Sequence, residues 1–157
     1  RAFEMLERVL FFKKTALFRN VSAEKLMRLA EIAHEATYGK GAIVSAQGNL
    51  SEHLYIVKNG TLKIIKSDGL TTTVLTTLES GQTYGEIGLF TQAPRSASAV
   101  AEDVCDLYII KRSTFKKLIV EVPDIAMSLL EALSDRLRKS GEEMVELKRL
   151  SSEKCVG

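Results

Sequence analysis

The sequence predicts an α+β fold that is mainly β: an antiparallel β-roll or jelly roll flanked by N-terminal helices and a long C-terminal helix. Eight of the ten glycines fall between Gly39 and Gly88, where short runs of β-branched and aromatic residues alternate with turn signals. Both flanks are nearly free of glycine and carry apolar residues at helical spacing. A chain of 157 residues, 45% of them hydrophobic, suits one compact domain without a metal or disulfide.

Residues 1–36 are expected to form a helical lead-in. Apolar residues recur there at helical spacing, first at Phe3, Leu6, Val9 and Leu10, and then at Leu26, Leu29, Ala30 and Ala33. Ser22 precedes the second stretch and is a favourable N-cap residue. The glycines Gly39 and Gly41 are expected to end this helical pattern.

Residues 37–112 are expected to form the β-roll. The Asn59-Gly60 pair lies between the β-rich runs 54–57 and 62–65, which predicts a hairpin. A second hairpin is predicted at Asp68-Gly69. Further strand signals are Val74, Leu75 and Leu78, and the run from Val104 to Ile110 with Cys105, Leu107 and Ile109 at alternate positions.

Residues 113–150 are expected to be helical, with Pro123 in a first turn, and residues 151–157 to form a polar tail. A heptad-like seam follows Pro123 and consists of Ala126, Leu130, Leu133, Leu137, Ser140, Met144 and Leu147. Two interpretations fit this seam. The helix either lies across its own β domain or pairs with the same helix of a second copy, which would give a homodimer.

The charge balance excludes several classes of protein. Lys plus Arg number 22 and Asp plus Glu 20, and a net charge of +2 argues against binding a polyanion through bulk charge.

No apolar run reaches the roughly 20 residues that span a bilayer, and the N-terminus lacks a signal-peptide pattern. Cys105 and Cys155 lie far apart, which indicates reduced thiols and a cytoplasmic location. The first residue is Arg1, so a fragment or a processed chain is expected.

The segment 81–97 contains the residue types of a small anion site. Gly85 and Gly88 let the backbone approach a ligand closely, and a helical turn near Glu86 would direct N–H groups towards an anion. The guanidinium of Arg95 matches the oxygens of a phosphate, and the Ser96 hydroxyl adds a hydrogen bond. Glu86 would be repelled by a phosphate, but it can accept a hydrogen bond from a ribose hydroxyl. The alternative is a plain structural ion pair between Glu86 and Arg95.

The motifs Gly85-Glu86-Ile87-Gly88-Leu89 and Pro94-Arg95-Ser96-Ala97 resemble the phosphate-binding cassette of cyclic nucleotide-binding domains. The resemblance extends over most of the chain. It includes Leu17-Phe18, the run 39–44, Gln47-Gly48, the run 54–57 with Gly60, Gly81, and the stretch 115–137. Tyr84 departs from the family, which commonly has phenylalanine at this position.

The resemblance implies a role for each matching residue. Glu86 would bind the ribose 2′-hydroxyl and Arg95 the cyclic phosphate. Backbone amides near Gly88 and Ala97, with the Ser96 side chain, would complete the phosphate shell. The cassette positions carried over are Gly85, Glu86, Ile87, Gly88, Leu89, Arg95, Ser96 and Ala97. The positions expected near the base are Ile64, Leu75 and Thr76 on the β wall and Arg136 and Ser140 on the long helix.

The sequence therefore predicts a sensor domain for cAMP, or alternatively cGMP, with no other cofactor, and whose C-terminal helix rearranges when the ligand binds. Such a module would be the regulatory part of a larger signalling protein, such as a channel, transporter or kinase. An enzyme is not expected, because His34 and His53 lack metal-ligand spacing and Cys105 lies in a predicted strand. No nucleic-acid reader is expected either, since few residues follow the long helix. The alternative function is a ligand-free interaction or oligomerisation module.

Overall fold

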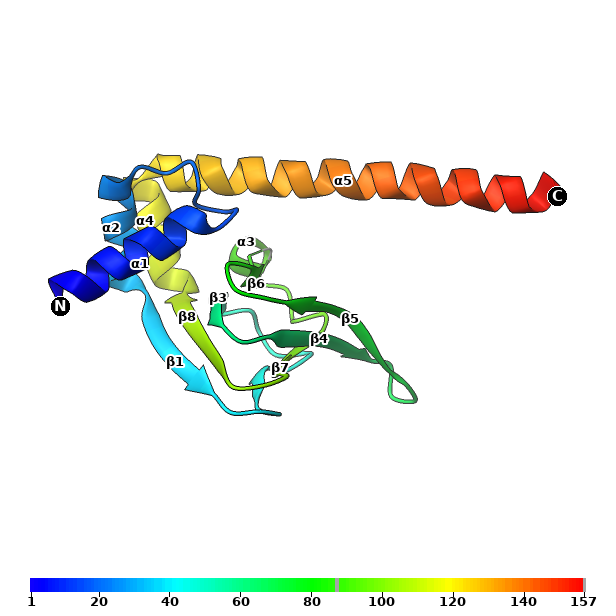
Figure 1. Cartoon of the computed structure of the whole chain (residues 1–157), viewed down its shortest axis with the longest axis horizontal. Helices are drawn as coiled ribbons and strands as arrows, with labels where there is room; N and C mark the ends of the chain where they lie inside the picture. The colour runs from blue at the N-terminus through cyan, green and yellow to red at the C-terminus, as the bar shows by residue number, and fades with distance from the viewer. Residues whose placement is uncertain (87, 157) are drawn as a thin grey trace.

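The computed structural model describes residues 1–86 and 88–156, and its centre is a pair of four-stranded antiparallel sheets packed face to face (Figure 1). The strand order is β1-β8-β3-β6 in the first sheet and β2-β7-β4-β5 in the second. The strands are β1 (His34–Tyr38), β2 (Ile43–Ser45), β3 (His53–Asn59), β4 (Leu62–Ser67), β5 (Thr72–Leu78), β6 (Thr83–Tyr84), β7 (Ser98–Ala101) and β8 (Cys105–Lys111). The predicted antiparallel β-roll is thereby confirmed.

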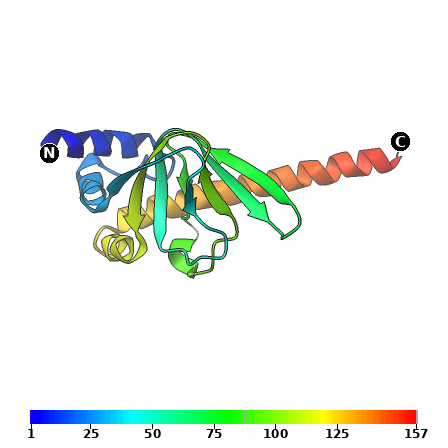
Figure 2. The same cartoon turned by 90° about the horizontal axis from the view of Figure 1, so that it is seen from below.

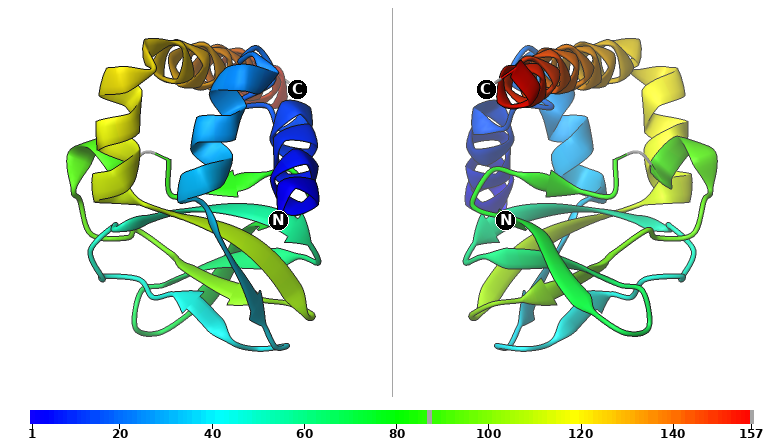
Figure 3. Two further views of the ribbon diagram at one scale, coloured as in Figure 1. Left: turned by 90° about the vertical axis from the view of Figure 1, so that its left-hand side faces the viewer. Right: turned by 90° about the vertical axis from the view of Figure 1, so that its right-hand side faces the viewer.

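Helices cover one side of the roll and continue past it. They are α1 (Ala2–Lys14), α2 (Ala23–Ile32), the short α3 (Gly88–Thr91), α4 (Arg112–Glu121) and α5 (Pro123–Val156). Figure 3 shows α1, α2, α4 and α5 together on the same side of the strands. Figure 2 shows α5 passing behind the strands in that view and continuing out beyond them. No helix in the described ranges is both long and apolar enough to cross a membrane.

Strand β3 separates two hydrophobic cores and is buried on both faces. Leu54 and Ile56 point into the core shared with the helices, where Phe12, Phe18 and Phe115 also pack. Tyr55 and Val57, on the opposite face, belong to the core between the two sheets. This central strand is therefore packed on both faces and held in place by both cores.

The N-terminal segment ends its helical part earlier than predicted. The Ser22 side chain accepts a hydrogen bond from the Lys25 N–H, which confirms the expected N-cap of α2. Helix α2 stops at Ile32, however, and β1 already pairs with β8 from His34. The boundary expected at residue 37 missed this strand because its sequence, HEATY, has no apolar alternation.

The predicted hairpin at Asn59-Gly60 is wrong, whereas the one at Asp68-Gly69 is confirmed. Strands β3 and β4 flank Asn59-Gly60 but belong to different sheets, so the chain crosses between sheets there. Gly60 has a φ of +87°, and a Cβ on it would lie 2.4 Å from the Val104 carbonyl oxygen. The glycine thus serves a close approach to the turn before β8. Strands β4 and β5 do pair, around an Asp68 carboxylate that accepts the Thr71 N–H at 2.8 Å.

Helix α5 has a packed part and a projecting part. It starts at Pro123, as predicted, and buries Ile125 and Leu129 in the helical core. The Ser128 hydroxyl donates a 2.5 Å hydrogen bond to the Leu17 carbonyl, which anchors this part. From Ser134 to Cys155 every side chain is exposed. The helix continues through residues 151–156, where a tail was expected, and Gly157 lies outside the described residues.

Candidate functional site

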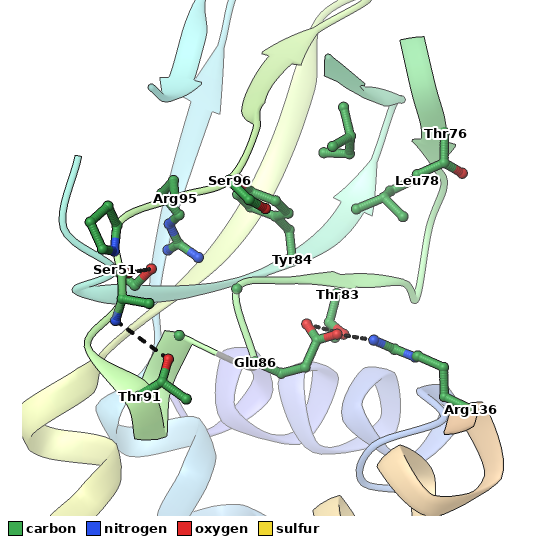
Figure 4. Close-up of a pocket in the computed structure, with 15 residues that line it drawn as sticks. Ser51, Thr76, Leu78, Thr83, Tyr84, Glu86, Thr91, Arg95, Ser96 and Arg136 are labelled. Carbon is green, nitrogen blue, oxygen red and sulfur yellow. Dashed lines mark hydrogen bonds and ion pairs between the residues drawn. The ribbon is translucent and has the colours of Figure 1, made fainter. Parts of the chain in front are cut away.

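A cavity of about 370 Å³ opens between the cassette, the β4–β5 hairpin and α5 (Figure 4). Its walls combine residues from distant parts of the chain. They are Ser51, Ile64, Thr76, Leu78, Thr83, Tyr84, Gly85, Glu86, Gly88, Thr91, Ala93, Pro94, Arg95, Ser96 and Arg136. The structure thus brings Glu86 and Arg95, predicted from the sequence as a pair of ligand contacts, to the same cavity.

Arg95 is the best-fixed charged group of the cavity. The residue is only 6% exposed, and Nη2 donates a 2.6 Å hydrogen bond to the His53 carbonyl. Its guanidinium carbon lies 4.8 Å from the ring centre of Tyr84 and 5.9 Å from that of Tyr55. Within the described ranges, the buried Nε finds no hydrogen-bond partner. A buried cation with a free donor at a cavity wall is prepared for an anion.

Glu86 faces the same cavity but pairs with a different arginine. It is 5% exposed, and its Oε2 accepts a 3.4 Å hydrogen bond from the Thr83 hydroxyl. Its Oε1 forms an ion pair with Nη1 of Arg136, which extends from α5 towards the cassette (Figure 4). The alternative of a Glu86–Arg95 ion pair is therefore not what the described residues form. The carboxylate instead joins the cassette to the long helix.

Two glycines allow the cassette to pack this closely. Gly85 has a φ of +98°, and a Cβ there would lie 2.4 Å from Nη1 of Arg95 and 2.8 Å from the His53 carbonyl. A Cβ on Gly88 would lie 2.3 Å from the Ser51 hydroxyl oxygen. None of these three distances is sterically allowed, so both positions require glycine. Helix α3 begins at Gly88, so the predicted helical turn is present directly after the cassette glutamate.

The remaining cassette positions have different places. Ser96 is exposed at the cavity mouth, and Ala97 is 3% exposed with its carbonyl accepting the Tyr84 hydroxyl at 2.7 Å. Leu89 is fully buried in the helical core and is not part of the cavity wall. Ile87 lies outside the described residues.

Two of the positions expected near the base lie away from the cavity. Ile64, Thr76 and Arg136 line it, whereas Leu75 is 54% exposed. Ile64 pairs with Thr76 and Ile65 with Val74, so Leu75 is the extra residue of a β-bulge, and Leu78 lines the wall instead. Ser140, about one helical turn beyond Arg136, is exposed and also lies outside the cavity lining.

Some cavity residues carried no signal in the sequence. Ser51 is 5% exposed, donates a 3.0 Å hydrogen bond to the Ala93 carbonyl and so ties the chain before β3 to the cassette. Thr83, in β6, orients Glu86. A lone serine or threonine in a polar stretch has no periodicity that would have indicated either role.

Burial changes the proton affinity of the groups around Arg95. It raises the pKa of the Tyr84 and Tyr55 phenols, although the Arg95 cation opposes the rise. Burial also lowers the pKa of His53, with the neighbouring Arg95 and Lys111 cations acting in the same direction and Glu52 against it. The phenols and the imidazole are therefore held neutral beside the buried guanidinium of Arg95. No group of three His, Cys, Asp or Glu side chains able to hold a metal occurs within the described ranges.

Two packed antiparallel sheets, a helical flank and this cavity place the chain in the class of β-roll domains with a ligand-sized cavity. The family model of the cyclic nucleotide-binding domain matches residues 35–121, more than half of the chain. The chain therefore belongs to the cyclic nucleotide-binding domain family, as its cassette motifs predict.

Relatives and solved structures agree with this assignment. The cyclic AMP receptor protein of Thermus thermophilus is 30% identical over 133 residues, which are 84% of this chain and 62% of that protein. The crystal structure of the Thermus thermophilus catabolite activator protein has a TM-score of 0.76 at 29% identity, covering 85% of this chain and 63% of that one. The regulatory subunit of the Yarrowia lipolytica cAMP-dependent protein kinase is 30% identical over 67% of this chain, but this is 27% of the subunit. By name these relatives are regulators, and the chain spans less than two thirds of each.

Proposed function

We propose that this domain binds a cyclic nucleotide, cAMP in preference to cGMP, and thereby regulates a larger signalling protein. The observation that carries the proposal is the buried Arg95, whose Nε is unpartnered among the described residues, on the same cavity wall as Glu86. One cation and one carboxylate match the two polar ends of a sugar-phosphate. The volume of about 370 Å³ falls in the range of small-molecule sites.

The arrangement supports one orientation of the ligand. The cyclic phosphate would contact Arg95, the Ser96 hydroxyl and the backbone at Gly88 and Ala97. Glu86 would accept a hydrogen bond from the ribose 2′-hydroxyl. The base would then lie towards Ile64, Thr76 and Leu78, which form the apolar part of the wall. The names of the relatives, a cyclic AMP receptor and a cAMP-dependent kinase subunit, support cAMP as the ligand.

The Glu86–Arg136 ion pair supports a movement of α5 on binding. A ribose hydroxyl would compete with Arg136 for the same buried carboxylate, so the ligand would weaken a tie between cassette and helix. The Arg136 side chain is 52% exposed and has room to move. Ligand shifts a conformational equilibrium only when it prefers one arrangement, and this competition supplies such a preference.

The projecting part of α5 favours a homodimer in addition. Leu137, Met144 and Leu147 are 75%, 59% and 67% exposed and belong to one heptad-like seam. Pairing with a second α5 would bury them. This surface also supports the alternative function, an interaction module that keeps the fold without the ligand.

The free thiols Cys105 and Cys155 favour the cytoplasm as the location.

Calorimetry with cAMP and with cGMP tests the proposal. Arg95→Ala should weaken binding by about 100-fold, because it removes a buried charged contact to the phosphate. Arg95→Lys keeps the positive charge but loses the forked pair of guanidinium donors. Its affinity should lie between those of the wild type and Arg95→Ala. Arg138→Ala, at an exposed position of α5, serves as the matched control and should bind like the wild type.

The same samples separate the accompanying proposals. Hydrogen exchange along α5 should change when cAMP is added, and sedimentation should show a dimer. Circular dichroism verifies that each variant is folded. If the wild type gives neither heat nor a thermal shift with either nucleotide at millimolar concentration, the sensor function is wrong. A dimer in that case would favour the interaction module.

A further inference from the structure

Tyr84 contacts both parts of the site that would hold the phosphate. Its ring lies under the guanidinium of Arg95, with 4.8 Å between the guanidinium carbon and the ring centre. Its hydroxyl donates a 2.7 Å hydrogen bond to the Ala97 carbonyl. Tyr84 directly precedes the first cassette motif in β6 and Ala97 ends the second motif, so this hydrogen bond joins the two ends of the cassette loop.

The aromatic contact restricts a side chain that is otherwise flexible. Arginine carries about 2 kcal/mol of rotamer entropy, which anion binding must overcome if the guanidinium is free beforehand. Three groups hold Arg95 before any ligand binds. They are the Tyr84 ring, the Tyr55 ring stacked on it with 6.3 Å between the two ring centres, and the His53 carbonyl. The ordering cost is then met by folding instead of by binding.

The hydroxyl fixes the backbone on the other side of the same anion. The hydrogen bond from Tyr84 to the Ala97 carbonyl fixes the Ala97–Ser98 peptide plane, and this restrains the adjoining Ser96–Ala97 peptide, which carries the Ala97 N–H. Burial raises the pKa of Tyr84, which keeps the phenol protonated and able to donate.

We propose that Tyr84 is a positioning residue for phosphate recognition, whose ring orients Arg95 and whose hydroxyl orients the Ser96–Ala97 backbone. The inference rests on the proposed binding of a cyclic nucleotide. It gives the tyrosine hydroxyl, which the phenylalanine common at this position lacks, a function of its own. The ring and the hydroxyl act on separate groups and are separable by substitution.

Two substitutions divide the two contributions. Tyr84→Phe keeps the ring and should weaken cAMP binding about fivefold, the effect of one hydrogen bond. Tyr84→Leu removes the ring as well and should weaken binding about 50-fold, since a desolvated cation–π contact is lost in addition. The matched control is Tyr108→Phe, which removes the hydroxyl of a tyrosine buried in the other core. It should leave the affinity within twofold of the wild type.

A spectroscopic measurement distinguishes positioning from a general loss of structure. The Arg95 Nε–H should give a resolved, slowly exchanging NMR signal in the free wild type and in Tyr84→Phe, and a broadened one in Tyr84→Leu. In the Arg95→Lys background, Tyr84→Leu should cost much less affinity than in the wild type, because its target guanidinium is gone.

Each outcome has one meaning. A wild type that binds no cyclic nucleotide overturns the proposed function and this inference with it. A wild type that binds, with Tyr84→Phe and Tyr84→Leu both within twofold of it and the Arg95 signal unchanged, overturns this inference alone. Equal losses from Tyr84→Leu in the arginine and lysine backgrounds also contradict it, since they would reflect a structural effect.

Discussion

The two arginines that reach the cavity, Arg95 from the cassette and Arg136 from α5, are held very differently. Arg95 is 6% exposed and fixed by a carbonyl and two aromatic rings. The Arg136 side chain is 52% exposed and extends from the part of α5 whose side chains, from Ser134 to Cys155, are all exposed. For the proposed function, we therefore expect the rigid cassette side to set the affinity and the helix side to transmit the response.

Substitution of Gly85 should have the largest effect, because it disturbs the rigid side. The Cβ of Gly85→Ala would collide with Nη1 of Arg95 and with the His53 carbonyl, at a φ of +98°. We expect at least about a 100-fold loss of cAMP affinity, by calorimetry, and about 2 kcal/mol loss in the free energy of unfolding.

Gly41→Ala is the matched control for Gly85→Ala. Gly41 has a φ of +84°, but apart from its chain neighbours no atom of the described residues lies within 4 Å of its Cβ position. It should therefore lose about 1 kcal/mol of stability from backbone strain while keeping its affinity. If both variants lost affinity equally, backbone strain alone would explain the effect, and the rigid placement of Arg95 would be irrelevant.

The two parts of α5 should differ next in size of effect. Leu129, 1% exposed in the core, should lose about 3 kcal/mol of unfolding free energy on Leu129→Ala in urea denaturation. Leu137, 75% exposed, should lose less than about 0.5 kcal/mol on Leu137→Ala when the protein is dilute and monomeric. Sedimentation should show instead that Leu137→Ala weakens dimer formation. Similar losses of stability for the two variants would contradict a projecting distal helix.

The smallest effect concerns pH and His53. Its pKa in the folded protein lies below 6.5, chiefly because of burial, so the unfolded chain binds more protons as the pH falls. The contribution of neutral His53 to the free energy of unfolding should therefore be fully present above pH 6.5. It should decrease as the pH falls from 6.5 through the pKa of His53 in the folded protein. His53→Gln should flatten that part of a denaturation series, whereas His34→Gln, at an exposed strand position, should not. An unaltered pH dependence in His53→Gln would mean that other groups cause it.

The sequence predicted the site best at residue types that are scarce in this part of the chain. Arg95 is the one arginine between Arg28 and Arg112, and Glu86 precedes it at the cassette spacing, so both were predicted and both line the cavity. The partner of Glu86 was not predicted. Arg136 was expected near the base, and its ion pair with the carboxylate depends on how α5 crosses the cassette, which no local pattern encodes.

The errors arose where a local signal had a different three-dimensional cause. Asn59-Gly60 has the composition of a hairpin turn, but its glycine accommodates the turn before β8, and the chain changes sheets there. Leu75 was expected in the base wall together with Thr76, but only Thr76 and Leu78 line it. Successive residues of a strand point to opposite faces, so the neighbours Leu75 and Thr76 could not both face the cavity.

The anchor of α5 at Ser128 has a mechanical consequence. An α-helix rises about 1.5 Å per residue, so the far end of α5 lies about 40 Å from that anchor. If breaking the Glu86–Arg136 tie lets the helix swing by about 10°, its far end travels about 7 Å, whereas Arg136, two turns from the anchor, shifts by about 2 Å. The projecting helix would thus amplify a displacement of about 2 Å at the cavity into one of about 7 Å at its far end.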